Sequence, residues 1–155
     1  MLGVVAALAG TGVATGEPRA LVPVVRDLEA RVIDPVAAVE RMPHGVRLPG
    51  DVLFAFDADE LGTPGRRAVT AAAGILARGH ARRLTVEGHT DARGKAAYNL
   101  RLAQRRARTV ADALRSALPG ARIVVRAYGE ARPVASNASP SGRARNRRVE
   151  IRPTG

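Results

Sequence analysis

The chain has 155 residues, which suits a single domain with an additional arm. It contains no cysteine, and this excludes a thiol nucleophile, thiolate metal ligands, disulfides and a lipid-modified cysteine anchor. A formal net charge of +11 predicts attraction to polyanions such as nucleic acid, anionic lipid or an anionic wall polymer, whereas an aromatic content of 3% disfavours base stacking with single-stranded nucleic acid.

The first 49 residues differ in composition from the rest of the chain. Residues 1–16 are apolar and small, and this stretch is too short to cross a bilayer. Two interpretations stay open for it: a truncated signal peptide that lacks the positive n-region, or an apolar arm. Residues 17–49 form a Pro/Val-rich N-terminal extension, which we expect to lean as extended pieces on a domain at 50–155.

From residue 51 onward, the hydrophobic pattern predicts alternating strands and helices. Helices are expected between Thr63 and a stop at Gly79 and between Asn99 and Leu118, where apolar residues recur at helical spacing. Short apolar runs predict strands at 51–56, 82–89, 121–129 and 146–153, with a loop at 130–142. The order is β-α-β-α-β-β. It predicts an α+β fold, a mixed sheet with both helices packed on one face.

The second helix carries an apolar stripe and a dense set of arginines. At about 100° per residue, the stripe that faces the sheet contains Leu100, Ala103, Ala107, Val110, Ala111, Leu114 and Leu118. Arg101, Arg105 and Arg108 point toward solvent. Arg106 lies at the edge of the stripe beside Asn99, where a partly desolvated guanidinium suits a carboxylate ligand. Helix geometry alone favours an arginine whose stem covers apolar surface.

Asp91 follows the second predicted strand and precedes Gly94. It suits either a turn or cap or an acceptor for a ligand cation at the end of the sheet, and spacing alone favours the turn. The three histidines, His44, His80 and His89, have no metal-ligand spacing, and no serine lies in a nucleophile elbow. We therefore expect no enzyme, metal or cofactor.

The segment from Val86 to Val110, VEGHTDARGKAAYNLRLAQRRARTV, resembles the peptidoglycan-binding segment of OmpA-like C-terminal domains. That family includes the peptidoglycan-associated lipoprotein and the flagellar stator protein MotB. Its pattern, G-H-T-D-x-x-G followed by N-x-x-L-S-x-x-R-A, is matched here except that Ala103 replaces the serine. The stretches VLFAFDADEL and GRARNRRVEI resemble the first and last strands of the family. The likeness covers residues 50–152, with the three motifs in the family's order.

The resemblance implies which residues bind the ligand. The matched aspartate, Asp91, binds the ammonium of a diaminopimelate side chain in the peptidoglycan stem peptide, and the matched Arg106 binds its carboxylate. The resemblance also implies supporting contacts from Asn99, Thr90, Asp59 and Arg147. For Arg147 an alternative stays open, in which it is a structural or surface residue. Asp59 stands where many relatives carry Asn, which bears on preference for amidated or free stem peptides.

The expected function is non-catalytic binding of peptidoglycan, which tethers the protein to the bacterial cell wall. The resemblance implies an exported protein of the cell envelope, in the cell wall or periplasm, and the sequence predicts no transmembrane span. The alternative is a basic protein that binds a polyanion, nucleic acid or teichoic acid, through Arg101, Arg105, Arg108 and Arg115. No specific nucleic-acid partner is expected.

Overall fold

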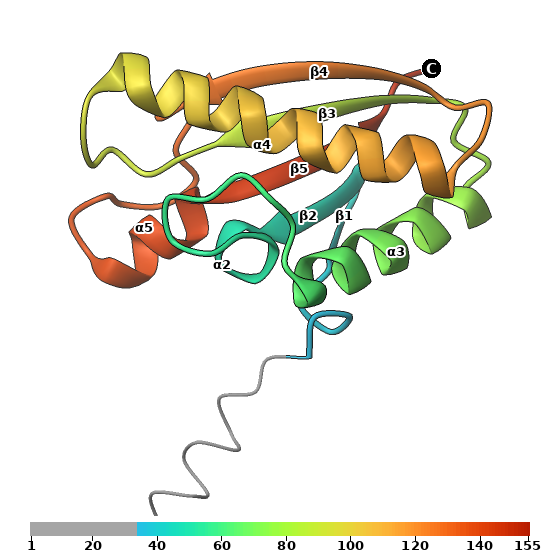
Figure 1. Ribbon diagram of the computed structural model, residues 1–155, viewed down its shortest axis with the longest axis horizontal. Coiled ribbons are helices and arrows are strands. Elements are labelled where there is room, and N and C mark those ends of the chain that lie inside the picture. Colours follow the sequence, from blue (N-terminus) through green and yellow to red (C-terminus); the bar gives the residue numbers. More distant parts are fainter. Residues whose placement is uncertain (1–33) are drawn as a thin grey trace, which may run out of the picture. The chain divides into compact units, whose positions relative to one another are not determined.

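The computed structural model describes residues 34–155. The predictions for residues 1–16, and for the part of the extension before residue 34, lie outside the described residues. The described chain contains a five-stranded sheet in the order β1-β2-β5-β3-β4 (Figure 1). The strands β3 and β4 are parallel, and the other neighbouring pairs are antiparallel. Their bounds are Glu40–Met42 (β1), Gly45–Pro49 (β2), Arg83–His89 (β3), Arg122–Gly129 (β4) and Arg148–Pro153 (β5).

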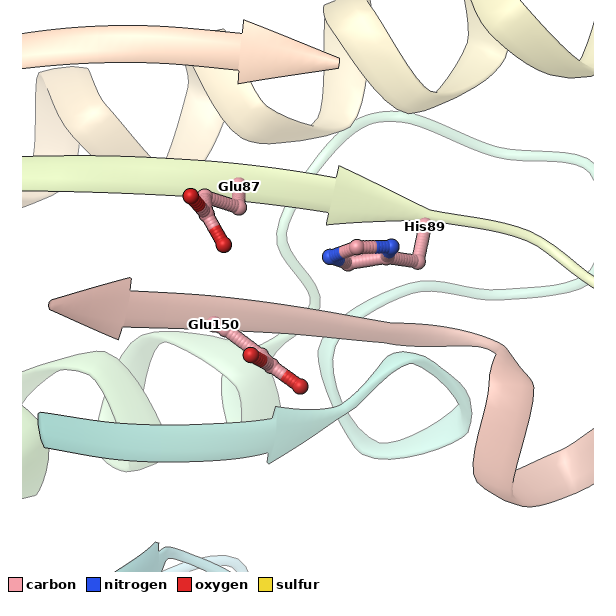
Figure 2. A group of neighbouring side chains, drawn as sticks. All are labelled: Glu87, His89 and Glu150. Carbon is pink, nitrogen blue, oxygen red and sulfur yellow. The ribbon is translucent and has the colours of Figure 1, made fainter. Parts of the chain in front are cut away.

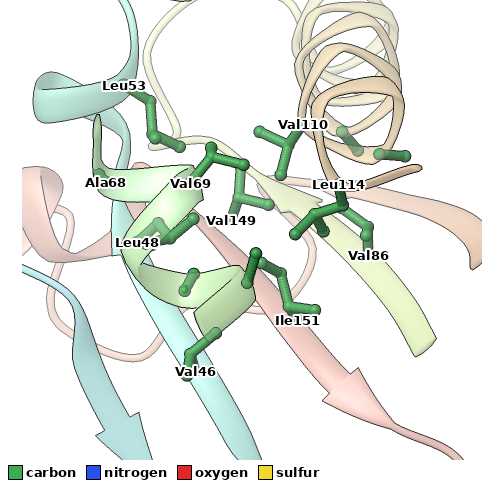
Figure 3. Packing of buried hydrophobic residues seen from close by; sticks show 14 of the residues in the cluster. Val46, Leu48, Leu53, Ala68, Val69, Val86, Val110, Leu114, Val149 and Ile151 are labelled. Atoms are coloured by element: carbon green, nitrogen blue, oxygen red, sulfur yellow. The ribbon is translucent and has the colours of Figure 1, made fainter. Parts of the chain in front are cut away.

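The two long helices pack on one face of this sheet, as expected from the sequence. They are α3 (Thr63–Arg78) and α4 (Ala96–Ala117), and two short helices are α2 (Gly50–Leu53) and α5 (Pro140–Asn146). Figure 3 shows aliphatic side chains from the strands and both long helices meeting in one core; those labelled include Val46, Leu48, Val69, Val86, Val110, Leu114, Val149 and Ile151. The expected α+β fold with a mixed sheet is confirmed.

Close packing fixes the start of α4 against the end of β3. A Cβ atom added to Gly88 in β3 would lie 2.2 Å from the carbonyl oxygen of Ala103 in α4. Only glycine allows this approach, because the nearest atom is backbone. The contact brings the residues after β3 beside the first two turns of α4.

Four predicted features are wrong in detail. The predicted loop at 130–142 and strand at 146–153 overlap the helix α5 (Pro140–Asn146), and the last strand begins only at Arg148. Residues 51–56 are not a strand: the helix α2 ends at Leu53, and Phe54 then forms an isolated bridge with Leu61. Residues 40–49, assigned to the extension, form β1 and β2, and the fully buried Val46 and Leu48 of β2 belong to the core. Leu100, predicted to lie on the buried stripe of the second helix, is 47% exposed, and at this end of the helix Leu102 is buried instead.

Candidate functional site

Asp91 lies in the loop between β3 and α4, two residues beyond the end of β3. The preceding residue, Thr90, donates its backbone N–H to the carbonyl oxygen of Gly129 at 2.9 Å, which ties this loop to the end of β4. The side chain of Asp91 is buried, and its Oδ1 accepts the backbone N–H of Arg93 at 2.9 Å. Asp91 therefore makes the turn bond that spacing favours, and its second oxygen accepts from other donors.

The second carboxylate oxygen of Asp91 faces two guanidinium groups. Arg147 donates from Nη1 to Oδ2 at 2.6 Å, and Nη2 of Arg93 donates to the same atom at 3.3 Å. Burial opposes ionisation, but the Arg93 amide and the two guanidinium groups outweigh it and hold the pKa of Asp91 below its ordinary value. Asp91 is therefore an anion at neutral pH.

Arg106 extends from α4 under the loop that follows α2. Its side chain is 8% exposed, Nε donates to the carbonyl oxygen of Ala58 at 2.8 Å, and the guanidinium carbon lies 5.0 Å from the ring centroid of Phe54. Burial lowers the pKa of Arg106, and the carboxylates of Asp51 and Asp57 oppose that shift. Within residues 34–155, no group accepts a hydrogen bond from its two terminal nitrogens. A charged, oriented fork is thus left for a ligand.

Asp91 and Arg106 line the same pocket, which has a volume of about 710 Å³. Of the other residues named from the sequence, Thr90, Asn99 and Arg147 also line it. Asp59 does not. Its carboxylate accepts from Nε of Arg105 at 2.9 Å in a solvent-exposed pair. The structure therefore brings five of the six expected residues together and places Asp59 outside.

Asn99 holds the Asp91 loop through its amide nitrogen. This nitrogen donates to the carbonyl oxygens of Asp91 (3.3 Å) and Arg93 (3.0 Å) and to Oε2 of Glu130 (2.6 Å). The amide has only two hydrogens, so these acceptors already use its donor capacity. Asn99 supports the site by fixing the loop, whereas the buried hydroxyl of Thr90 has no partner among the described residues.

The family model for OmpA matches residues 53–147 of the chain, well over half of its length. The chain belongs to the OmpA family.

Two curated relatives match this chain over part of their own length. The chain is 42% identical to outer membrane porin F of Pseudomonas aeruginosa over 107 residues, 68% of this chain and 31% of the porin. It is 42% identical to the outer-membrane lipoprotein YfiB of the same organism over 101 residues, 64% of this chain and 60% of the lipoprotein. The chain therefore spans less than two thirds of the length of these curated relatives. Their names agree with the expected location in the cell envelope.

Two further comparisons name proteins of the cell wall. The peptidoglycan-binding protein ArfA of Mycobacterium tuberculosis is 46% identical over 70 residues, 44% of this chain and 22% of that protein. The solved structure of the cell wall anchor of the T6SS from Pseudomonas aeruginosa has a TM-score of 0.64 and 34% identity, covering 86% of this chain and 95% of the anchor. No helix among residues 34–155 is long and apolar enough to span a membrane.

Sequence reasoning missed several residues that line the pocket of this OmpA domain. Asp57 has a positive φ of 57°, and its Oδ1 accepts the hydroxyl of Tyr98. Phe56, beside it, is 93% exposed on the pocket rim. The acidic turn DADEL indicates this loop, but the sequence pattern does not show that Asp57, rather than Asp59, lines the pocket.

A second polar cluster lies on the sheet face opposite the long helices (Figure 2). Ligand atoms of Glu87, His89 and Glu150 lie within 4.8 Å of one another, which is close enough to suggest a metal site. However, Oε1 of Glu150 accepts from Nε of Arg148 at 2.7 Å, and its Oε2 accepts from Nη2 of Arg152 at 2.5 Å. Arg152 also pairs with Glu87 at 3.3 Å. Arginines already neutralise both carboxylates, so we assign no cation to this cluster.

Proposed function

We propose that this OmpA-family domain binds peptidoglycan without catalysis, through the zwitterionic end of a diaminopimelate side chain. The observation that carries the proposal is the buried Arg106, whose terminal nitrogens have no acceptor among the described residues, in the same pocket as the ionised Asp91. A ligand with one ammonium and one carboxylate complements this pair. Asp91 accepts the ammonium, and the fork of Arg106 binds the carboxylate in two parallel hydrogen bonds.

The charge of the pocket lining supports a zwitterion over a polyanion. Three carboxylates and three guanidiniums line the pocket: Asp51, Asp57 and Asp91, and Arg93, Arg106 and Arg147. These charges cancel formally. A balanced lining favours a ligand that carries both signs, whereas a polyanion would gain nothing from the carboxylates.

The structure gives less support to the alternative function, polyanion binding through the solvent-facing arginines of α4. Of the four arginines proposed there, Arg105 pairs with Asp59 at 2.9 Å and Arg115 pairs with Asp112 at 2.6 Å. The remaining two, Arg101 and Arg108, are exposed. Two separated surface arginines are a small electrostatic footprint, although they favour approach to an anionic wall.

The relatives support a tethering role. ArfA is named as a peptidoglycan-binding protein, and the T6SS relative is named as a cell wall anchor. We infer that this domain likewise attaches its protein to the wall of the cell envelope, and that a free carboxylate next to the ligand's ammonium is part of what it recognises.

Sedimentation with purified, diaminopimelate-containing peptidoglycan tests this proposal. Asp91→Ala and Arg106→Ala are each expected to reduce the bound fraction by at least about tenfold, because each leaves one end of the ligand without its counter-charge. Matched controls are Asp59→Ala and Arg105→Ala, which remove the same two side-chain types from an exposed pair outside the pocket. If both pocket variants fold and bind the wall like the wild type, the assigned site is wrong.

A further inference from the structure

Arg147 bridges two carboxylates at the edge of the pocket. Its Nε and Nη2 donate to Oδ1 and Oδ2 of Asp51 at 2.8 and 2.7 Å, which is a two-pronged ion pair. Its remaining terminal nitrogen, Nη1, donates to Oδ2 of Asp91 at 2.6 Å. One edge of the guanidinium is thus committed to Asp51, and a single nitrogen reaches Asp91.

The way in which Arg147 shares its nitrogens between Asp51 and Asp91 determines which carboxylate oxygens of Asp91 can accept a hydrogen bond from a ligand. An arginine paired with one carboxylate prefers the two-pronged geometry, in which it covers both oxygens. Asp51 takes that geometry instead, so Arg147 contacts only Oδ2 of Asp91. Without Asp51, the same edge of Arg147 is free to turn onto Asp91 and compete with a ligand ammonium.

The backbone holds Asp51 and Arg147 in this relation. The N–H of Gly50 donates to the carbonyl oxygen of Arg147 at 2.8 Å, and Pro49 pairs with Arg148 across β2 and β5. A Cβ atom at Gly50 would lie 2.9 Å from that carbonyl oxygen. The first turn of α2 is therefore packed directly on the residue whose side chain Asp51 binds.

We propose that Asp51 is a positioning residue for the ligand: it keeps Arg147 in a one-nitrogen contact with Asp91 and so leaves the Asp91 carboxylate able to accept the ligand ammonium. This inference rests on the proposed function of the pocket. In this proposal Asp51 affects binding by fixing the position of Arg147. Two other roles are possible in principle and are distinguished by experiment: direct attraction between Asp51 and the ligand, and a surface ion pair that has no effect on binding.

A double-mutant cycle measured by calorimetric titration with meso-diaminopimelate separates these roles. Asp51→Asn is expected to weaken binding about fivefold in the wild-type background, the size of a good exposed charge interaction, and less than about twofold in the Arg147→Gln background. Asp51→Glu restores the charge and is expected to recover most of the affinity. Asp59→Asn, the matched loss of an exposed acid outside the pocket, should leave affinity unchanged.

A second readout follows Asp91 itself. The pKa of its carboxyl, measured by NMR, is expected to fall in Asp51→Asn because Arg147 closes on it, and to change less when Arg147 is already Gln. Equal losses of affinity in both backgrounds would show direct attraction and overturn the inference, as would an unchanged affinity in folded Asp51→Asn. Failure of the wild type to bind diaminopimelate overturns the proposed function and, with it, this inference; failure of the coupling alone overturns only the role of Asp51.

Discussion

The buried carboxylate of Glu150 is expected to be a main source of the domain's stability at neutral pH. This residue lies on β5 and is 1% exposed. Its Oε1 accepts from Arg148 at 2.7 Å and from Arg47 at 3.2 Å, and its Oε2 accepts from Arg152 at 2.5 Å. Burial opposes ionisation, yet the hydrogen bonds and charges of Arg148 and Arg152 lower the pKa of Glu150 from 4.5 to about 2. Glu150→Gln keeps the shape of the side chain and removes the charge.

The magnitude follows from this pKa. A change from 4.5 to about 2 corresponds to about 3 kcal/mol of preference for the ionised form in the folded state. The variant also leaves Arg148, itself buried, without its counter-charge, and breaking a buried pair costs about 3–5 kcal/mol. We expect Glu150→Gln to lower the free energy of unfolding at pH 7 by about 3 kcal/mol.

Urea unfolding at a series of pH values measures this effect. Because the folded pKa is depressed, the contribution of Glu150 is complete above about pH 4.5 and is lost as the pH falls toward 2. The wild type should lose stability across that window, and Glu150→Gln should follow a flatter profile. A loss at pH 7 of less than about 1 kcal/mol, together with unchanged pH dependence, would refute the reasoning, because the arginine network would then contribute nothing net.

Three further predictions concern the sheet and the site loop. Gly88→Ala should destabilise the domain by at least about 2 kcal/mol in thermal unfolding, because the new Cβ meets the carbonyl oxygen of Ala103 at 2.2 Å; a melting temperature equal to the wild type would contradict the close packing. Burial and Arg148 lower the pKa of His89 to about 4, so its neutral form stabilises the fold above pH 6.5 and this contribution is lost as the pH falls toward 4. His89→Gln should therefore reduce the dependence of the free energy of unfolding on pH between 6.5 and 4, a range that lies mostly above the pH range of Glu150. Asn99→Ala should weaken binding of meso-diaminopimelate several-fold with an unchanged pocket charge; full affinity would show that its amide bonds to the loop are dispensable.

The regular elements were predictable because their patterns are long. The helices α3 and α4 show sustained helical periodicity and clear end signals, and β3, β4 and β5 are bounded by turns or glycine. The run Val52–Phe54 is too short for this logic, since a short apolar run suits a strand and a buried helical turn equally. The strand β2 was not predicted because the prolines near it disfavour a regular strand. Its alternate residues Val46 and Leu48 are nevertheless fully buried.

The site was predictable only where its residues lie on or next to regular elements. Helix angles placed Arg106 at the edge of the buried stripe, where the structure finds it, and the strand end placed Asp91. Of the acids in the 57–59 turn, Asp57 lines the pocket, whereas Asp59, the one expected to support binding, does not. Asp57 has a positive φ of 57°, and Asp59 pairs with Arg105 outside the pocket. No local pattern specifies this arrangement or the bridge that Arg147 makes between two distant carboxylates.

The most direct test of the account compares two stem tripeptides that differ only in the third residue, meso-diaminopimelate or lysine. Lysine keeps the ammonium that Asp91 would accept but lacks the carboxylate that the fork of Arg106 would bind. Calorimetric titration should show at least about tenfold tighter binding of the diaminopimelate peptide, and Arg106→Gln should abolish that difference. Equal affinity of the wild type for both peptides would contradict recognition of a zwitterion in this pocket.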